Sequence, residues 1–103
     1  PGPAKLMVVG VGRVVIHMSA NRSLKDKRRI MQSTLAQIQH RFTISAAEIE
    51  RQDQWQVGVI GFSCVSSDAS HADSVLGSVV HYLENGGVDA ELLDVQTELL
   101  HAL

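Results

Sequence analysis

The sequence predicts one α+β domain, residues 1–103, in which a four-stranded antiparallel sheet carries two helices on one face. Three observations predict it. Two long segments rich in valine and glycine, 7–18 and 55–65, lack helical spacing and are typical of strands. Two segments of helical periodicity alternate with them. The 103 residues, of which 45% are hydrophobic and 19% charged, suit a single modest core.

The first strand and the first helix have the clearest patterns. Residues 7–18, MVVGVGRVVIHM, are apolar on both alternating faces, which predicts a central strand. Ser23 is a good N-cap, and Asp26 gives a short-armed capping box for a helix that runs to about Arg41. The inner stripe of this helix is Ile30, Met31, Thr34, Leu35 and Ile38, and its outer face carries Lys25, Arg28, Arg29 and Gln32.

A hairpin is expected in the middle of the chain. Residues 42–50, FTISAAEIE, predict a strand, but the alternation of apolar side chains slips, so we expect a bulge near Ala46. The polar residues 51–54 form a turn, and the apolar strand 55–65 follows.

A second helix and a fourth strand complete the chain. Ser67 or Asp68 caps the helix, which ends at the Asn-Gly-Gly sequence of residues 85–87. Residues 88–99 predict the last strand. The order is that of a ferredoxin-like βαββαβ sandwich, in which the first and third strands are central. This topology places the start of the first helix, the hairpin turn and the loop after the second helix at one end.

The charges are unevenly distributed along the chain. Residues 1–53 hold all 9 Lys and Arg with 4 acids, whereas residues 54–103 hold 7 acids and no Lys or Arg. This division predicts one surface region that attracts anions. A pI near 6.2 argues against a protein that coats nucleic acid indiscriminately.

The composition favours a cytoplasmic protein. The single cysteine, Cys64, lies in an apolar run and has no partner for an intrachain disulfide, which fits a reducing compartment. No apolar stretch reaches the about 18 residues of a membrane span. Two interpretations remain for residues 1–6: a flexible start of the chain, or residues that are partly foreign to the natural protein.

A basic cluster at the predicted start of the first helix is the main functional candidate. It contains Arg22, Lys25, Lys27, Arg28 and Arg29. Cations are disfavoured at the positive end of the helix dipole, where free N–H groups can bind phosphate oxygens. One interpretation is a solvated helix start that helps solubility. The other is an anion grip that holds RNA phosphates without sequence specificity, with Arg51 and Trp55 of the hairpin beside it.

Trp55 has two interpretations as well. A packing residue at the start of a strand is the favoured one, because tryptophan is usually well buried. Stacking on a base is the alternative. A base-reading sheet with aromatic side chains on its central strands is not expected, since the first strand has none. The open sheet face would show Val9, Val11 and Val57, which predicts a homodimer through that face.

Several motifs resemble those of a known family. SLKDKRR, AAEIERQDQWQ and GVIGFSCVSSD, after an opening MVVGVGRV, resemble the YlxP-like family of small bacterial proteins over residues 7–100. The resemblance implies a ferredoxin-like fold and a cytoplasmic protein, but no established activity and no catalytic residue. Genes of the family often lie among translation and ribosome-maturation genes, which associates it with RNA or a ribosomal particle. Gly12 departs from the family, in which a larger apolar residue is common.

Catalytic and metal sites have little support. Acylphosphatases share the topology, and Arg22 would imitate their phosphate-holding arginine, but their loop sequence is absent. The five histidines show no metal-binding spacing, and Cys64 is expected in the core. We therefore expect no cofactor and no metal. The expected function is non-catalytic binding of RNA or a ribosomal particle, with a dimeric protein-interaction module as the alternative.

Overall fold

The computed structural model describes residues 7–103 and confirms the ferredoxin-like βαββαβ sandwich. The strands are β1 (Met7–His17), β2 (Ser45–Glu50), β3 (Val57–Ser66) and β4 (Glu91–Ala102), and the helices are α1 (Leu24–Arg41) and α2 (Ala69–Tyr82). A wide helical turn, η1 (Leu83–Gly87), follows α2. Neighbouring strands are antiparallel in the order β2-β3-β1-β4, so β1 and β3 are central as predicted. The expectation for residues 1–6 lies outside the described residues.

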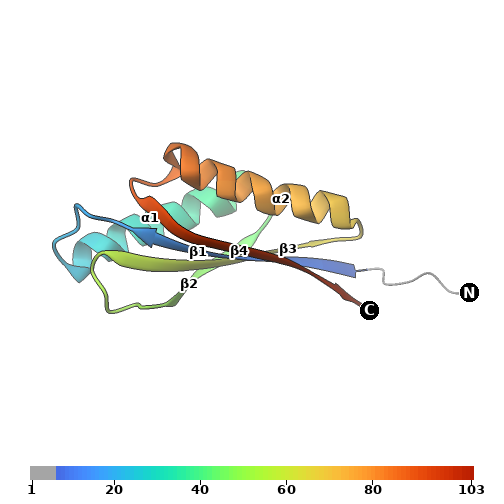
Figure 1. Cartoon of the computed structure of the whole chain (residues 1–103), viewed down its shortest axis with the longest axis horizontal. Coiled ribbons are helices and arrows are strands. Elements are labelled where there is room, and N and C mark those ends of the chain that lie inside the picture. Colours follow the sequence, from blue (N-terminus) through green and yellow to red (C-terminus); the bar gives the residue numbers. More distant parts are fainter. Residues whose placement is uncertain (1–6) are drawn as a thin grey trace, which may run out of the picture.

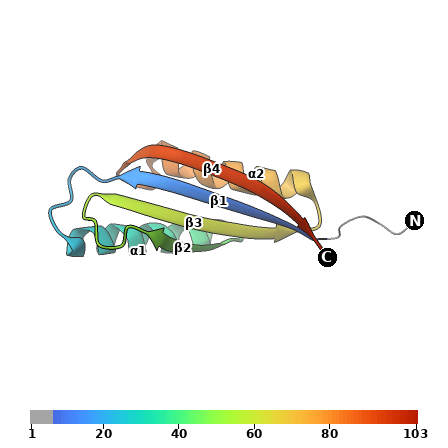
Figure 2. The same cartoon turned by 60° about the horizontal axis from the view of Figure 1, so that its bottom comes forward.

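Both helices cover the same face of the twisted sheet, and the core lies between the two layers (Figure 1). Figure 2 shows the other face, which no helix covers. Alternate residues of the two central strands point toward the helices and are buried, among them Ile16 of β1 and Phe62 of β3. Cys64 also lies in this core, as expected. No helix within residues 7–103 is long and apolar enough to cross a membrane.

Gly12 allows an aromatic ring to lie directly against β1. A Cβ added at this glycine would come within 2.2 Å of the Phe62 ring. The larger apolar residue that the family resemblance implies at this position is therefore replaced here by the Phe62 side chain from the neighbouring strand.

Side-chain caps begin both helices, as predicted. Ser23 Oγ accepts a hydrogen bond from Asp26 N at 3.1 Å, and Asp26 Oδ2 accepts one from Arg22 N at 2.9 Å. At α2, Asp68 Oδ1 accepts a hydrogen bond from Ser70 N at 3.0 Å, which selects Asp68 over Ser67 as the cap. These bonds satisfy N–H groups that have no partner within the helix.

The second strand differs from the prediction in its start and in its bulge. β2 begins at Ser45, because Phe42 N donates to Ile38 O at 2.9 Å and so still belongs to the end of α1. The register of β2 on β3 shifts between Glu48 and Glu50, so the expectation of a bulge near Ala46 is wrong. The shift leaves Glu48 on the helix side of the sheet.

The open face of the sheet is only partly aliphatic. Arg13 of β1 reaches across β3 to Glu50 of β2, with Nε to Oε1 at 3.1 Å and Nη2 to Oε2 at 2.9 Å. Its Nη1 also lies 3.7 Å from Asp94 Oδ2 of β4. Val15 and Val59 face this side and are nevertheless buried. The exposed apolar side chains of this face are Ile49, which lies against Gly61 beside Arg13, and Val65 and Leu100 at the end farther from the α1 start.

The Arg13 cluster shifts the pKa of Glu50. The hydrogen bonds from the Arg13 guanidinium, with its positive charge, hold the pKa of Glu50 below its usual range. The same bonds raise the pKa of Arg13. The pair therefore links β1 to β2 through two charged groups on the open face.

Candidate functional site

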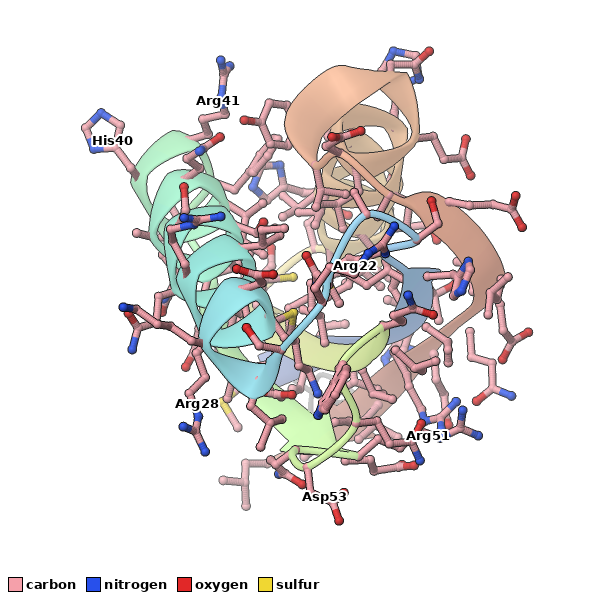
Figure 3. All side chains as sticks on the ribbon, turned by 90° about the vertical axis from the view of Figure 1, so that its left-hand side faces the viewer. Arg22, Arg28, His40, Arg41, Arg51 and Asp53 are labelled. Atoms are coloured by element: carbon pink, nitrogen blue, oxygen red, sulfur yellow. The ribbon has the colours of Figure 1, made fainter. Side chains whose placement is uncertain are left out.

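One end of the sandwich gathers most of the basic side chains that the sequence singled out. Figure 3 looks at this end and shows Arg22, Arg28 and Arg51 around it, with Asp53 at the tip of the hairpin. We call this surface the basic end and define it by its exposed members, which are Arg22, Lys25, Arg28, Arg29, Arg51 and Trp55. They come from the β1–α1 loop, the first two turns of α1 and the β2–β3 turn.

Lys27 does not belong to this surface, and the expectation that it contacts phosphate is wrong. Its side chain is 0% exposed, and its Nζ lies 2.7 Å from Glu48 Oε2. The same ammonium donates a hydrogen bond to Arg51 O at 2.5 Å. Lys27 is on the inner side of α1 because it precedes Met31 by four residues and Thr34 by seven, which places all three on one helical stripe. Its role is to tie α1 to β2 and the turn.

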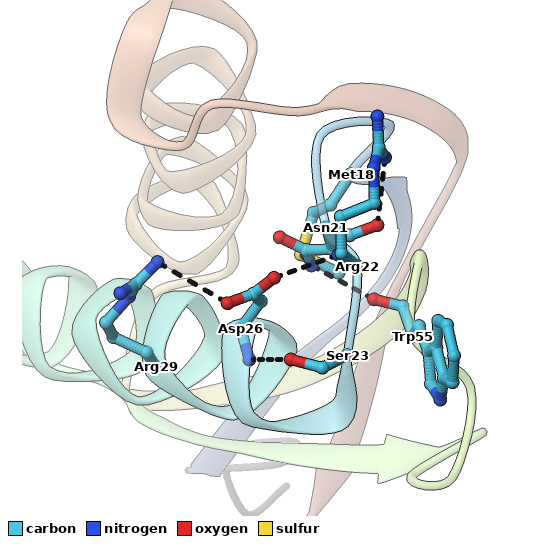
Figure 4. A network of polar contacts seen from close by, with 7 residues as sticks. All are labelled: Met18, Asn21, Arg22, Ser23, Asp26, Arg29 and Trp55. Carbon is cyan, nitrogen blue, oxygen red and sulfur yellow. Dashed lines mark hydrogen bonds and ion pairs between the residues drawn. The ribbon is translucent and has the colours of Figure 1, made fainter.

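The backbone at Trp55 is held by a second buried polar residue, Asn21 (Figure 4). Asn21 is 3% exposed, and its Nδ2 donates to Trp55 O at 3.0 Å and contacts Met18 Sδ at 3.4 Å. The adjacent Gln56 O accepts a hydrogen bond from Met18 N at 2.7 Å. The turn between β2 and β3 is thus fixed to the β1–α1 loop.

The Trp55 ring itself is free of the core. It is 54% exposed and is absent from the core cluster of the described residues. Figure 4 shows the indole directed away from the network that holds its backbone. Of the two packing positions that the sequence favours for Trp55, the core or its rim, the core is excluded.

Arg22 is exposed but tethered to its own loop. Its Nη1 donates to Ser19 O at 3.1 Å and to Asn21 O at 3.3 Å. Gln56 Nε2 donates to the same two carbonyls, at 3.2 and 3.1 Å. A phosphate-holding loop of the acylphosphatase type would instead direct N–H groups and an arginine at an anion. This loop directs carbonyl oxygens at its arginine.

Arg51 holds an unusual backbone conformation at the start of the turn. Its φ is +56°, in the left-handed region that non-glycine residues seldom adopt. Its carbonyl accepts hydrogen bonds from Lys27 Nζ and, at 3.1 Å, from Gln54 N. These two bonds compensate for the unfavourable conformation, while the Arg51 side chain is exposed.

The outer face of α1 carries the remaining cations. Lys25, Arg28 and Arg29 are exposed and, with Asp26 and Gln32, line a shallow surface depression. Arg29 Nη2 lies 3.9 Å from Asp26 Oδ1, a solvent-exposed ion pair of the kind that contributes little. On the other side of α1, Arg29 also lines a groove with Gly86 and Gly87, so the loop after α2 lies near the helix as expected.

Metal binding and reactive groups are not concentrated here. Within residues 7–103, no group of three or more His, Cys, Asp or Glu side chains is placed to hold a metal ion. What the basic end offers chemically is exposed positive charge beside one exposed aromatic ring. The sequence missed Asn21 and the Lys27–Glu48 pair, which fix this geometry.

Comparisons with known proteins agree with the fold. YlxP, an uncharacterised protein of Bacillus subtilis (strain 168), is 33% identical over 63 residues, which is 61% of this chain and 68% of that protein. The designed protein Foldit4 has a TM-score of 0.54 at 10% identity, covering 94% of this chain and 99% of its own, and so shares the fold. A family model described as "Protein of unknown function (DUF503)" matches residues 9–97, and this chain belongs to that family.

Proposed function

We propose that this protein binds RNA through the phosphate groups that its basic end can contact. The observation that supports the proposal most directly is the gathering of five exposed cations at one end, Arg22, Lys25, Arg28, Arg29 and Arg51. Asp26 and Asp53 lie among them, Asp89 lines a groove with Arg29, and Glu50 precedes Arg51 but is paired with Arg13. Asp26 already accepts a hydrogen bond from Arg22 N and an ion pair from Arg29. The surface therefore keeps an excess of positive charge.

The position of the cations on α1 makes an anion favourable there. Lys25 lies three residues before Arg28 and four before Arg29, so like charges are neighbours on the helix surface. They also stand near the positive end of the helix dipole. Both effects are unfavourable in the free protein, and a bound phosphate relieves both.

Most acidic residues of the second half lie away from the basic end. They are on or beside α2 and β4, for example Asp73, Asp94 and Glu98, whereas Asp89 lines the groove beside Arg29. A net charge of −2 is thus compatible with one RNA-binding end. Contacts limited to one end also predict weak binding that depends strongly on salt.

The test is a salt titration of RNA binding. Fluorescence anisotropy of a labelled, unstructured RNA would be measured between about 50 and 200 mM NaCl, the range in which counterion release has a clear effect on affinity. With about three phosphate contacts, log K should fall with log salt with a slope of about −2, because each contact to a single strand contributes about −0.7. The variant with Lys25, Arg28 and Arg29 replaced by Ala should lose most of that slope.

A matched pair of single variants controls for general charge. Arg28 and Arg41 are both exposed arginines of α1, but Arg41 lies at the opposite end of the helix, 4.5 Å above the Tyr82 ring. Arg28→Ala should reduce the slope by about 0.7, and Arg41→Ala should leave it unchanged. Equal binding by the wild type and the triple variant would rule out the proposal.

A homodimer through the open sheet face is the second candidate. Val65, 68% exposed, and Leu100 flank Val9 in register and form an apolar row across three strands. A row of three side chains is much smaller than the about 20–30 residues that each partner of a stable complex contributes, so we expect a weak dimer. Analytical ultracentrifugation over a range of concentrations, with Val65→Asp as the variant, would reveal such a self-association.

A further inference from the structure

We infer that Trp55 stacks on an unpaired base of the bound RNA, so that the basic end prefers single-stranded RNA to duplex RNA. The inference rests on the proposed function and adds the class of RNA. It starts from an aromatic ring that the fold exposes while its backbone is held in place by buried polar groups.

The exposed ring is the first observation. An indole that is 54% exposed and outside the core cluster leaves apolar surface in water, where it contributes nothing to folding. Stacking on such a ring suits any base, because every base has a π face. The bases of a duplex are already stacked on one another and cannot reach the ring, whereas bases of a single strand can.

The second observation is how the turn is held. Among the described residues three polar or charged residues are buried, Asn21, Lys27 and Thr34. Two of them donate to carbonyls of the same turn, Asn21 to Trp55 O and Lys27 to Arg51 O. Buried polar groups are costly unless they are satisfied, so the protein uses two such groups to fix a turn that contributes little to the core. A turn whose backbone is already fixed loses less conformational entropy when its side chain binds a base.

The third observation is that cations surround the same turn. Arg51 begins the turn that Trp55 ends, and Arg22 belongs to the loop whose Asn21 holds the Trp55 carbonyl. Arg28 lies on the other side of the turn in Figure 3. A base stacked on the indole would have phosphates on both sides of its sugar, and Arg28 and Arg51 lie on opposite sides of the turn that carries the ring. The ring and the charges therefore suit one strand that passes over the turn.

Intrinsic fluorescence tests this inference directly, because Trp55 is the only tryptophan of the chain. The wild type would be titrated with a single-stranded RNA of ten adenosines and with a ten-base-pair RNA duplex at equal salt. Stacking predicts quenching by the single strand and little quenching by the duplex. It also predicts tighter binding of the single strand in the anisotropy assay.

Substitutions of the ring separate stacking from general apolar contact. Trp55→Phe should retain most of the affinity for the single strand, whereas Trp55→Leu should lose about 5-fold to 100-fold. Leu103→Ala removes another exposed apolar group, at the opposite end of the sheet, and should have no effect. Far-UV circular dichroism would check that each variant is folded.

The outcomes distinguish this inference from the proposed function. Salt-dependent binding of the single strand and the duplex with equal affinity, without quenching, would overturn stacking and leave phosphate binding in place. Equal affinities of Trp55→Leu and wild type for the single strand would also overturn it. Absence of RNA binding in the wild type would overturn both proposals.

Discussion

The buried ion pair between Lys27 and Glu48 is the contact whose removal should be most damaging. Lys27→Met keeps a long apolar side chain but removes the ammonium from a position that is 0% exposed. Glu48, whose side chain is 18% exposed, then loses its only ion-pair partner among the described residues. We expect the free energy of unfolding to fall, because an unpaired carboxylate remains between α1 and the sheet.

The magnitude follows from the burial of the two partners. Removing one partner of a buried pair costs about 3–5 kcal/mol, and the residual exposure of Glu48 places the cost near the lower end. A domain of this size has a total stability of about 5–15 kcal/mol. A loss of about 3 kcal/mol should therefore lower Tm by more than about 10 °C.

Removing both charges should restore much of the stability. In the double variant Lys27→Met with Glu48→Leu no charge remains buried, and Arg51 O still accepts the hydrogen bond from Gln54 N. An apolar replacement for a buried pair is often close to neutral. The wild type, Lys27→Met, Glu48→Leu and the double variant form a double-mutant cycle. Their urea denaturation, followed by circular dichroism, would give the coupling energy of the pair.

A different result would refute this reasoning. If the Lys27 ammonium reached the surface and held phosphate, Lys27→Met would change stability by less than about 0.5 kcal/mol, as surface substitutions do. It would instead lower the salt slope of RNA binding by about 0.7, like Arg28→Ala. Stability near that of the wild type together with such a loss of slope would contradict the buried position.

Three further predictions concern the cap, the glycines and the open face. Ser23→Ala should lower the free energy of unfolding by about 1 kcal/mol in a urea titration, and an unchanged midpoint would argue against the cap. Gly12→Ala should cost about 1–3 kcal/mol, because its Cβ would lie 2.2 Å from an aromatic ring, whereas the control Gly77→Ala has open space and should stabilise α2 by about 0.5–1 kcal/mol in the same assay. In Arg13→Gln the pKa of Glu50, which lies below its usual range in the wild type, should rise in an NMR titration. The pKa of Glu50 is lower in the folded than in the unfolded protein, so the pair stabilises the wild type at pH values above the usual pKa of glutamate. This contribution is lost as the pH falls through the folded pKa, so the free energy of unfolding of Arg13→Gln should depend less on acid pH.

The fold was predictable because each element has a local cause. The valine-rich strands, the cap residues Ser23 and Asp68, and the glycines after α2 act over a few residues and agree with one another. The order of elements then leaves few topologies to consider. The position of the bulge in β2 was missed, because it depends on how Glu48 and Ile49 fit against α1 and Gly61, which are distant in sequence.

The candidate site was predictable in outline but not in its members. Lys27 was grouped with the surface cations because charged residues are seldom buried. The signal that corrects this was in the helical spacing, since the stripe of Ile38, Thr34 and Met31 continues back to Lys27. The sequence pattern does not predict Glu48 as its partner, because only the observed register of β2 on β3 places that carboxylate on the helix side of the sheet.

Trp55 lies outside the core because β3 begins later than the sequence predicts. The apolar run 55–65 suggests a strand that begins at the tryptophan, but β3 begins at Val57. Trp55 therefore lies in the turn, where its carbonyl is held and its ring is exposed. Because β3 starts two residues later than predicted, the ring lies in a solvent-exposed turn and not in the sheet.

The burial of Lys27 and the ion pairs of Arg13 reduce the number of cations that are available to a bound anion. Both residues count toward the basic first half of the chain, yet each is close to carboxylates, Lys27 to Glu48 and Arg13 to Glu50 and Asp94. Their charges are therefore largely compensated within the fold. The attraction of an anion falls to the cations of the basic end, which the turn and the α1 start hold together. If RNA binding depends on these positions, Asn21→Ala should weaken it in the folded protein, because the turn is then no longer held at Trp55 O. If binding depends only on the total basic charge, Asn21→Ala should leave the affinity unchanged.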